Sequence, residues 1–314
     1  MNLTDPIYSD PDLAREHLEA ILWPEGPFCP HCGAVEGIAK LQGTKSRSGL
    51  HYCNACHGQF TVTVGTVLER SKIPLNKWVL AFHLYAASKK GLSAHQLGRM
   101  LGITYKSAWF MAHRIREAMR ELNPTPMGGA NKVVEADETF VGGKEKNRHK
   151  SKRAKKRMGG SWGKETVFSL VEREGRVRSV HTPSVTAATL RPILVAQLDA
   201  KTMLMTDDAG QYRHMHRDFA HEVVNHGIGE YVRGDAHTNT VEGYFSILKR
   251  GVIGTYHHVS QQHLKRYLAE SDFRYNERTA LGISDTERAA KAIAGATGKR
   301  LTYRRTYERA HINA

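Results

Sequence analysis

The segment KVVEAD, residues 132–137, decides how the second half of the chain folds. It predicts a strand that ends in a carboxylate, Asp137. Two more strand-like segments follow at Thr166–Val171 and Arg176–His181, and the Glu174-Gly175 pair between them is typical of a hairpin. We therefore expect three neighbouring strands, with an acidic side chain at the end of the first.

A helix and a further strand follow this hairpin. Residues 186–198 predict the helix, and Thr202–Thr206 predict a strand that ends at a second acid, Asp207. Three strands, a helix and a fourth strand that ends in an acid are the order of an RNase H-like domain. We therefore predict an α+β fold whose second half is RNase H-like.

A third acidic side chain lies on a predicted amphipathic helix, Thr238–Arg250. Asn239, Glu242 and Lys249 share the polar face of this helix. The interval is also informative, because 34 residues separate Asp207 from Glu242. Each acid alone would usually be a turn, cap or solvated residue, and it is the order of the three that indicates a site.

Asp137, Asp207 and Glu242 are the expected catalytic ligands of two Mg²⁺ or Mn²⁺ ions. Hard divalent cations prefer carboxylate oxygens, and a metal pair can activate a nucleophile and stabilise the leaving oxygen of a phosphoryl displacement. Lys249 would contact DNA near the scissile phosphate, and Asn239 would contribute beside Glu242. Asp208 and Asp235 are interpreted as loop or capping residues.

All four cysteines fall into one pattern, Cys29-Pro-His-Cys32 and Cys53-Asn-Ala-Cys56, with 20 residues between the pairs. A Cys-x-x-Cys pair lets two thiolates reach one ion, and two pairs complete a tetrahedral site. Four unrelated buried thiols would leave the doubled spacing to chance. We predict a zinc ribbon whose ion is structural, because four thiolates leave no open position for a substrate.

Three helices with a helix-turn-helix order are expected next, over residues 76–89, 94–101 and 105–121. Ser93 and Thr104 are the predicted N-caps of the second and third helices, and Gly102 ends the second. In such a motif the N-terminal residues of the last helix meet the base edges in the major groove. The residues expected to contact DNA are Tyr105, Lys106, Trp109 and His113, with Arg114, Arg116 and Arg120 at phosphates.

A three-helix bundle with a solvated basic face is the alternative for this region. Residues 74–120 carry eight Lys/Arg against Glu117 alone, and this imbalance favours DNA binding.

The most basic stretch is KEKNRHKSKRAKKR, residues 144–157, with nine Lys/Arg against Glu145. Glycine pairs flank it and it has almost no apolar residues, so we expect a loop that emerges beside the active site and clamps phosphates non-specifically. The basic segment after Thr279 is expected to be a second backbone contact. The loop residues predicted to bind DNA are Lys152, Arg153, Lys155, Lys156 and Arg157.

The composition of the 314 residues agrees with a nucleic-acid partner. The formal net charge is +15, which indicates a polyanionic partner. The longest uncharged, mostly apolar run, residues 78–88, is too short to span a membrane, and the polar N-terminus is no signal peptide. We expect a cytoplasmic, nucleoid-associated protein with reduced cysteines and no membrane partner.

Three motifs carry a resemblance to a known family. They are VEADETFVGGKEKN at 134–147, LMTDDAGQY at 204–212 and HTNTVEGYFSILKRGV at 237–252. With the two cysteine pairs before them, the chain resembles the DDE transposases of bacterial insertion sequences, in the branch with an N-terminal zinc ribbon and an ISXO-like transposase domain.

The resemblance implies cleavage of transposon ends by water and attack of the freed 3′-hydroxyl on target DNA, both with Mg²⁺ or Mn²⁺. It also implies double-stranded DNA as partner and a homo-oligomer that bridges two ends. Asp137 and Asp207 match the first two carboxylates of the family. The third place often carries Asn in this branch, so Asn239 remains an alternative to Glu242 as the third ligand.

Two other functions stay open from the sequence. One is a catalytically silent DNA-binding regulator derived from a transposase, and the other is an RNase H-like nuclease or resolvase without strand transfer. The predicted organisation is an N-terminal helical segment at 1–22, a zinc ribbon at 23–64, a helix-turn-helix region at 74–122, a catalytic domain at 130–280 with a basic insertion at 142–165, and a basic tail at 281–314.

Overall fold

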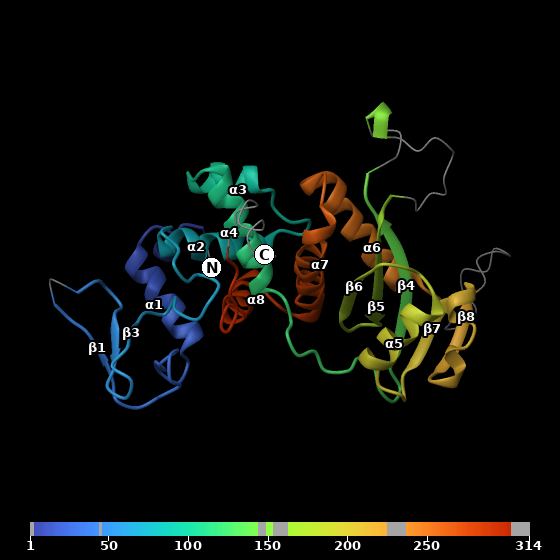
Figure 1. The fold of residues 1–314 in the computed structure, drawn as a ribbon, viewed down its shortest axis with the longest axis horizontal. Coiled ribbons are helices and arrows are strands. Elements are labelled where there is room, and N and C mark those ends of the chain that lie inside the picture. The colour runs from blue at the N-terminus through green and yellow to red at the C-terminus, as the bar shows by residue number, and fades with distance from the viewer. Residues whose placement is uncertain (1–2, 44–45, 144–148, 153–162, 225–236, 303–314) are drawn as a thin grey trace, which may run out of the picture. The chain divides into compact units, whose positions relative to one another are not determined.

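The structure is a computed structural model that describes residues 3–43, 46–143, 149–152, 163–224 and 237–302. The chain is mixed α+β and forms two units (Figure 1). One unit combines Met1–Arg120 with Thr279–Ala314, and the other is Glu121–Arg278. No helix within the described ranges has the length and apolar character that crossing a bilayer requires.

The first unit begins with α1 (Pro11–Leu22) and a small antiparallel sheet. The side chain of Asp10 caps α1 by accepting hydrogen bonds from the backbone N–H groups of Asp12 and Leu13. The sheet has the order β1-β2-β3, formed by Ile38–Lys40, His51–Cys53 and Gln59–Phe60. Strands β2 and β3 lie on either side of the second cysteine pair, and β1 consists of three partly or fully exposed residues.

Three helices follow as the sequence predicts, namely α2 (Leu75–Ala87), α3 (Ala94–Leu101) and α4 (Tyr105–Ala118). Ser93 and Thr104 are the N-caps, and Gly102 ends α3 with a left-handed backbone conformation at φ 60°. The buried face of α4 contains the four residues that its period predicts: Ala108, Met111, Ile115 and Met119.

The prediction that residues 281–314 form a basic tail is wrong for the part that the structure describes. Helix α8 (Asp285–Ala294) starts with a capping box formed by Ser284 and Glu287, and Ala289, Ala292 and Ile293 are buried. Ala289, Ala292 and Ile293 recur at the helical spacing of three and four residues, so they form the face of α8 that packs into the core of the first unit. Residues 303–314 lie outside the described ranges.

The second unit is built on a five-stranded mixed sheet with the order β6-β5-β4-β7-β8. Strands β4, β5 and β6 are antiparallel neighbours, and β4, β7 and β8 are parallel neighbours. The predicted succession of three strands, a helix and a fourth strand is confirmed. The strands are β4 (Val133–Val141), β5 (Glu165–Glu172), β6 (Val177–Thr182), β7 (Met203–Asp207) and β8 (Ala220–Val224).

Two features of this sheet differ from the prediction. Strand β4 does not end at Asp137 but continues to Val141, because Glu138–Val141 pair with Glu165–Phe168 of β5. Strand β8, at the sheet edge beside β7, was not predicted because its five residues are largely polar or exposed.

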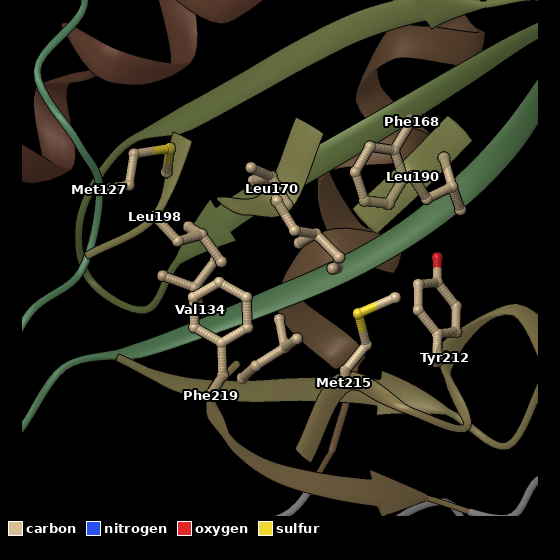
Figure 2. Packing of buried hydrophobic residues seen from close by; sticks show 12 residues of the cluster. Met127, Val134, Phe168, Leu170, Leu190, Leu198, Tyr212, Met215 and Phe219 are labelled. Atoms are coloured by element: carbon tan, nitrogen blue, oxygen red, sulfur yellow. The ribbon is translucent and has the colours of Figure 1, made fainter. Parts of the chain in front are cut away.

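Helices cover both faces of this sheet. Val134, Ala136 and Leu170 point to the face that packs against α5 (Ala187–Gln197), and Figure 2 shows this core with Leu190, Leu198 and Tyr212 around them. The other face packs against α6 (Asn239–Gly251) and α7 (Gln261–Asn276) through Val167, Val171, Val241, Phe245 and Leu264. Each fully buried aliphatic side chain contributes about 1.5–3 kcal/mol.

Polar side chains of α7 pair with the exposed edge of β6. The Asn276 amide donates to the Val177 carbonyl (3.0 Å) and accepts from the Val177 N–H (2.6 Å), as a neighbouring strand would. Asp272 accepts from the N–H of Ser179 (2.7 Å) and from the hydroxyl of Tyr244 on α6 (2.5 Å). These contacts fix α6 and α7 on one face of the sheet.

Short turns lie at Pro6–Tyr8, Lys150–Lys152, Gly210–Tyr212, Met215–Arg217 and Thr279–Leu281, and a π turn at Val252–Tyr256.

Candidate functional site

Asp137 and Asp207 lie on adjacent parallel strands of the large sheet. Strands β4 and β7 pair with Glu135 opposite Met205. Two residues further along, the same register places Asp137 beside Asp207, and neighbouring strands lie about 4.8 Å apart. Residues two apart share a face, so both carboxylates belong to the face that carries α6. The topology therefore brings the first two predicted acids together.

Helix α6 supplies the third acid to the same face. Val241 and Phe245 of α6 are buried against β5, which leaves Glu242 in the first turn and exposed. The hydroxyl of Thr238 donates to Oε1 of Glu242 at 3.4 Å. Glu242 also lies close enough to Asp137 to act on its charge, as the pKa of Asp137 shows.

Burial is the main cause that raises the pKa of Asp137 from 3.8 to about 7, and the neighbouring charges of Glu138, Asp207 and Glu242 contribute to the same rise. A hydrogen bond from the backbone N–H of Glu138 to Oδ1 of Asp137 (2.7 Å) opposes this rise only in part. The negative charges of these three neighbours thus all disfavour ionisation of Asp137. A bound divalent cation would relieve this repulsion.

The donor chemistry of these residues fits a hard cation such as Mg²⁺, because every ligand atom is a carboxylate oxygen. In the described part of the chain, only the four cysteines form a metal-type group with all ligand atoms within 4.8 Å of one another. The oxygens of Asp137, Asp207 and Glu242 therefore stand further apart than a single closed coordination shell.

The remaining predicted residues of this site are placed as follows. Asn239 is the first residue of α6 and is exposed, and Lys249 is exposed in the last turn of the same helix. Asp208 is exposed after the end of β7, as expected of a loop residue. Asp235 lies outside the described residues.

Sequence reasoning did not assign a role to Glu138 and its two partners. The Glu138 carboxylate accepts a hydrogen bond from the Gln211 amide at 2.6 Å and another from the buried hydroxyl of Tyr212. Burial raises the pKa of Glu138. These contacts join β4 to the turn after β7, and the signal for them was available in the quoted motifs, which contain all three residues.

The four cysteines form a compact cluster. Sγ of Cys29 lies 3.6 Å from Sγ of Cys56, and Sγ of Cys32 lies 3.7 Å from Sγ of Cys53. Four sulfurs about 2.3 Å from a central ion would stand roughly 3.8 Å apart, so the geometry fits a tetrahedral site. Burial favours the thiol form of Cys29, but hydrogen bonds from the backbone at His31 and Cys32 lower its pKa to about 6.

The predicted DNA-contacting residues of α4 fall into two groups. Tyr105 is 50% exposed and stacks on His95 with ring centroids 4.1 Å apart, and Lys106 is also exposed. Trp109 is half-buried beside His113. These positions occupy the first turns of the helix, where the motif places its reading residues.

The prediction that His113, Arg114 and Arg116 contact DNA is wrong in this structure, because all three are buried. Nη1 of Arg114 donates to the carbonyl of Glu69 at 3.0 Å, and the Arg116 guanidinium lies 5.4 Å from the ring centre of Tyr85. Both arginines therefore serve the packing of the first unit. Arg120 is exposed and pairs with Glu117.

Most of the basic insertion lies outside the described residues. Arg153, Lys155, Lys156 and Arg157 lie outside the described residues, as does the side chain of Lys152. In the C-terminal segment, Nζ of Lys299 is buried and donates to the carbonyl of Ala118 (2.7 Å), so it is unavailable for the expected backbone contact.

Comparison with known proteins gives matches over both units. Residues 128–276 match the ISXO2-like transposase domain, and residues 10–59 match the transposase zinc-ribbon domain. An uncharacterized protein in transposable element ISH50 of Halobacterium salinarum is 29% identical over 271 residues, which cover 83% of this chain and 89% of that protein.

Solved structures give weak likenesses only. A chain of the simian T-cell lymphotropic virus intasome in complex with PP2A regulatory subunit B56 gamma aligns at 15% identity and a TM-score of 0.28, covering 56% of this chain and 63% of that one. This chain thus spans less than two thirds of its length. A chain of the Mos1 strand transfer complex aligns at 11% identity and a TM-score of 0.26, covering 71% and 79%.

Proposed function

Because this chain belongs to the ISXO2-like transposase family, with the zinc ribbon found in transposases, we propose that it is an active DNA transposase. It binds the ends of an insertion sequence, cleaves them by metal-assisted hydrolysis and joins the 3′-hydroxyl ends to target DNA. The observation that carries the proposal is the convergence of Asp137, Asp207 and Glu242 on one face of an RNase H-like sheet.

Asp137, Asp207 and Glu242 would hold two Mg²⁺ or Mn²⁺ ions. When bound, such ions activate a nucleophile and stabilise the leaving oxygen of an in-line phosphoryl displacement. Asp137 and Asp207 are fixed by adjacent strands, which gives the site two rigid ligands. Asn239 and Lys249 lie on α6 with Glu242, so Lys249 can contact the phosphate backbone two turns from the carboxylate.

The four cysteines would hold a structural Zn²⁺ in the first unit. Their cluster closes the ribbon between its two knuckles and leaves no ligand position for DNA or water. The ion would therefore stabilise the fold of the ribbon and take no part in the reaction.

DNA would be bound by the start of α4 and by the basic insertion. Tyr105 and Lys106 are exposed in the first turn of α4, and an aromatic ring and a cation suit base edges and phosphates. The insertion at 144–157 supplies nine Lys/Arg and almost no apolar residues, which suits non-specific phosphate binding. Two or more copies of the chain would bridge the two transposon ends.

The test is incubation of the zinc-loaded protein with its flanking DNA ends and Mg²⁺, scoring nicking and joining separately. Wild-type protein should do both, and Asp137→Asn and Asp207→Asn should do neither. Asp208→Asn is the matched control, because this exposed acid should be dispensable. Glu242→Gln should abolish joining, whereas full joining by Glu242→Gln together with its loss in Asn239→Ala would assign the third ligand to Asn239.

The same assay separates the alternative functions. Binding of the ends without nicking indicates a regulator, and nicking without joining indicates a nuclease or resolvase. Joining that survives Asp137→Asn would refute the assignment of the active site.

A further inference from the structure

Glu135 lies two residues before Asp137 on β4, and its side chain is 0% exposed. Residues two apart on a strand share a face, so Glu135 is on the same side of the sheet as Asp137 and α6. A carboxylate so deeply buried is rare unless several donors compensate for its lost hydration. Its contacts therefore indicate what it does.

Glu135 caps the N-terminus of α6 from the neighbouring strand. Oε2 accepts hydrogen bonds from the backbone N–H groups of Thr240 (2.8 Å) and Val241 (3.0 Å), and Oε1 accepts one from the Thr240 hydroxyl (2.8 Å). Thr238, at the N-cap position, makes no side-chain capping bond. The first N–H groups of a helix otherwise lack partners and favour a negative charge, so Glu135 replaces the local cap.

Arg173 and His237 complete the surroundings of this carboxylate. Nε of Arg173 donates to Oε1 of Glu135 at 2.8 Å, and Nη2 of Arg173 donates to the carbonyl of His237 at 3.0 Å. Nδ1 of His237 lies 3.2 Å from the same oxygen. The pair of Arg173 and Glu135 therefore holds His237, two residues before α6, and the first turn of α6 against β4.

We propose that Glu135 is a positioning residue for the third carboxylate. It fixes the start of α6 on the strand that carries Asp137, so that Glu242 in the same first turn faces Asp137 and Asp207. This inference rests on the proposed function, since it assigns a means of assembling the same metal site. Two of the hydrogen bonds to Glu135 come from backbone N–H groups of the helix itself, so Glu135 sets the position of the whole first turn.

A carboxylate is required here rather than an amide. The two carboxylate oxygens of Glu135 accept hydrogen bonds from at least four donors. A glutamine would replace one of these oxygens with an NH₂ group, which cannot accept a hydrogen bond from the donors at that position. Glu135→Gln also leaves the Arg173 guanidinium without its buried counter-charge. The variant keeps the shape of the side chain but should loosen the first turn of α6.

The test uses the full-length, zinc-loaded protein with Mn²⁺ as the probe, and free Mn²⁺ is measured by electron paramagnetic resonance. Glu270→Gln is the matched control, because Glu270 is also 0% exposed, pairs with Arg274 and accepts from Tyr256 in the same unit. Glu270 is not among the charges that act on Asp137. Both variants should lose similar stability.

We expect Glu135→Gln to weaken Mn²⁺ binding by roughly tenfold or more, with Glu270→Gln unchanged, as for groups that orient metal ligands. Amide exchange of residues 237–245 should accelerate in Glu135→Gln alone. Thr240→Val keeps the backbone donor and loses only the hydroxyl bond to Glu135, so it should fold with little disturbance. It should weaken Mn²⁺ binding by about two- to threefold.

Two results would overturn the positioning role. One is that Glu135→Gln and Glu270→Gln lose Mn²⁺ affinity to the same extent. The other is that neither Glu135→Gln nor Thr240→Val changes Mn²⁺ affinity. Wild-type protein that binds no Mn²⁺ beyond its zinc site refutes the proposed function itself, and the role of Glu135 with it. The two failures are thus distinguished by whether the wild type binds the probe.

Discussion

Asp137→Asn should make the metal-free catalytic unit more stable at neutral pH, although it removes a catalytic group. The carboxyl of Asp137 has its pKa raised from 3.8 to about 7 by burial and by Glu138, Asp207 and Glu242. Between these two values the folded chain keeps a proton that the unfolded chain has lost. Stability therefore falls as the pH rises through this window.

The size of the effect follows from the shift. A rise of about 3 pKa units corresponds to about 4 kcal/mol at 1.36 kcal/mol per unit, of which roughly 2–3 kcal/mol falls between pH 5 and pH 8. Solvent screening at the partly exposed side chain reduces this figure, so we expect about 2 kcal/mol. The amide that Asp137→Asn introduces does not titrate, and its oxygen can still accept the hydrogen bond from the backbone N–H of Glu138.

The free energy of unfolding of the catalytic unit can be measured by native-state hydrogen exchange with mass spectrometry. The exchange rates of peptides from β4 and β5 are corrected for their intrinsic rates at each pH. From pH 5 to pH 8 without divalent cations, the wild type should lose about 2 kcal/mol more than Asp137→Asn. Asp272, whose pKa burial raises to about 6, titrates in the same direction in both proteins and cancels in the comparison.

Mg²⁺ provides the second arm of this experiment. It should restore the stability of the wild type at pH 8, because it binds only the folded site, and it should have little effect on Asp137→Asn. Parallel pH profiles for the two proteins would refute the reasoning, since the pKa of Asp137 would then not be raised by burial and by the neighbouring carboxylates.

Three further outcomes are expected. Cys53→Ser should reduce bound zinc, measured by elemental analysis, from about one ion per chain to near zero. His57→Ala is the control and should retain the zinc. Zinc retained in the serine variant would contradict the four-cysteine site. Lys299→Met should lower the unfolding free energy of the first unit by about 1–3 kcal/mol in urea titrations followed by tryptophan fluorescence, because a buried ammonium no longer caps α4. The exposed Arg300 offers the control, with an expected loss for Arg300→Met of about 0.5 kcal/mol or less. Lys106→Ala should weaken binding of end DNA and reduce the salt slope by about 1, measured by fluorescence anisotropy at several salt concentrations, and an unchanged slope would remove this residue from the interface.

The predictions that succeeded rest on local chemistry. The caps Ser93 and Thr104, the left-handed Gly102 and the cysteine knuckles are set by residues within a few positions of one another. The order of the acids along the chain indicated that Asp137 and Asp207 belong together, and the pairing of β4 with β7 places them at equivalent positions of parallel neighbours. Strand β8 was missed because it is held by pairing with β7 and has no period of its own.

The positions of buried polar groups could not be predicted, because they depend on partners far away in the sequence. Glu135 meets the first turn of α6 more than 100 residues later, and nothing in its own strand indicates that contact.

The errors on α4 have the same physical origin. Arg114 and Arg116 flank the buried Ile115 on two sides of the helix, and charged side chains beside a buried stripe are normally solvated. In this fold both sides are covered, since Arg114 binds the carbonyl of Glu69 and Arg116 lies on Tyr85 of α2. Arginine tolerates such sites because its stem packs as an apolar chain while its guanidinium binds carbonyls and ring faces. The charge of this region therefore overstates its basic surface, because two of its eight Lys/Arg are buried.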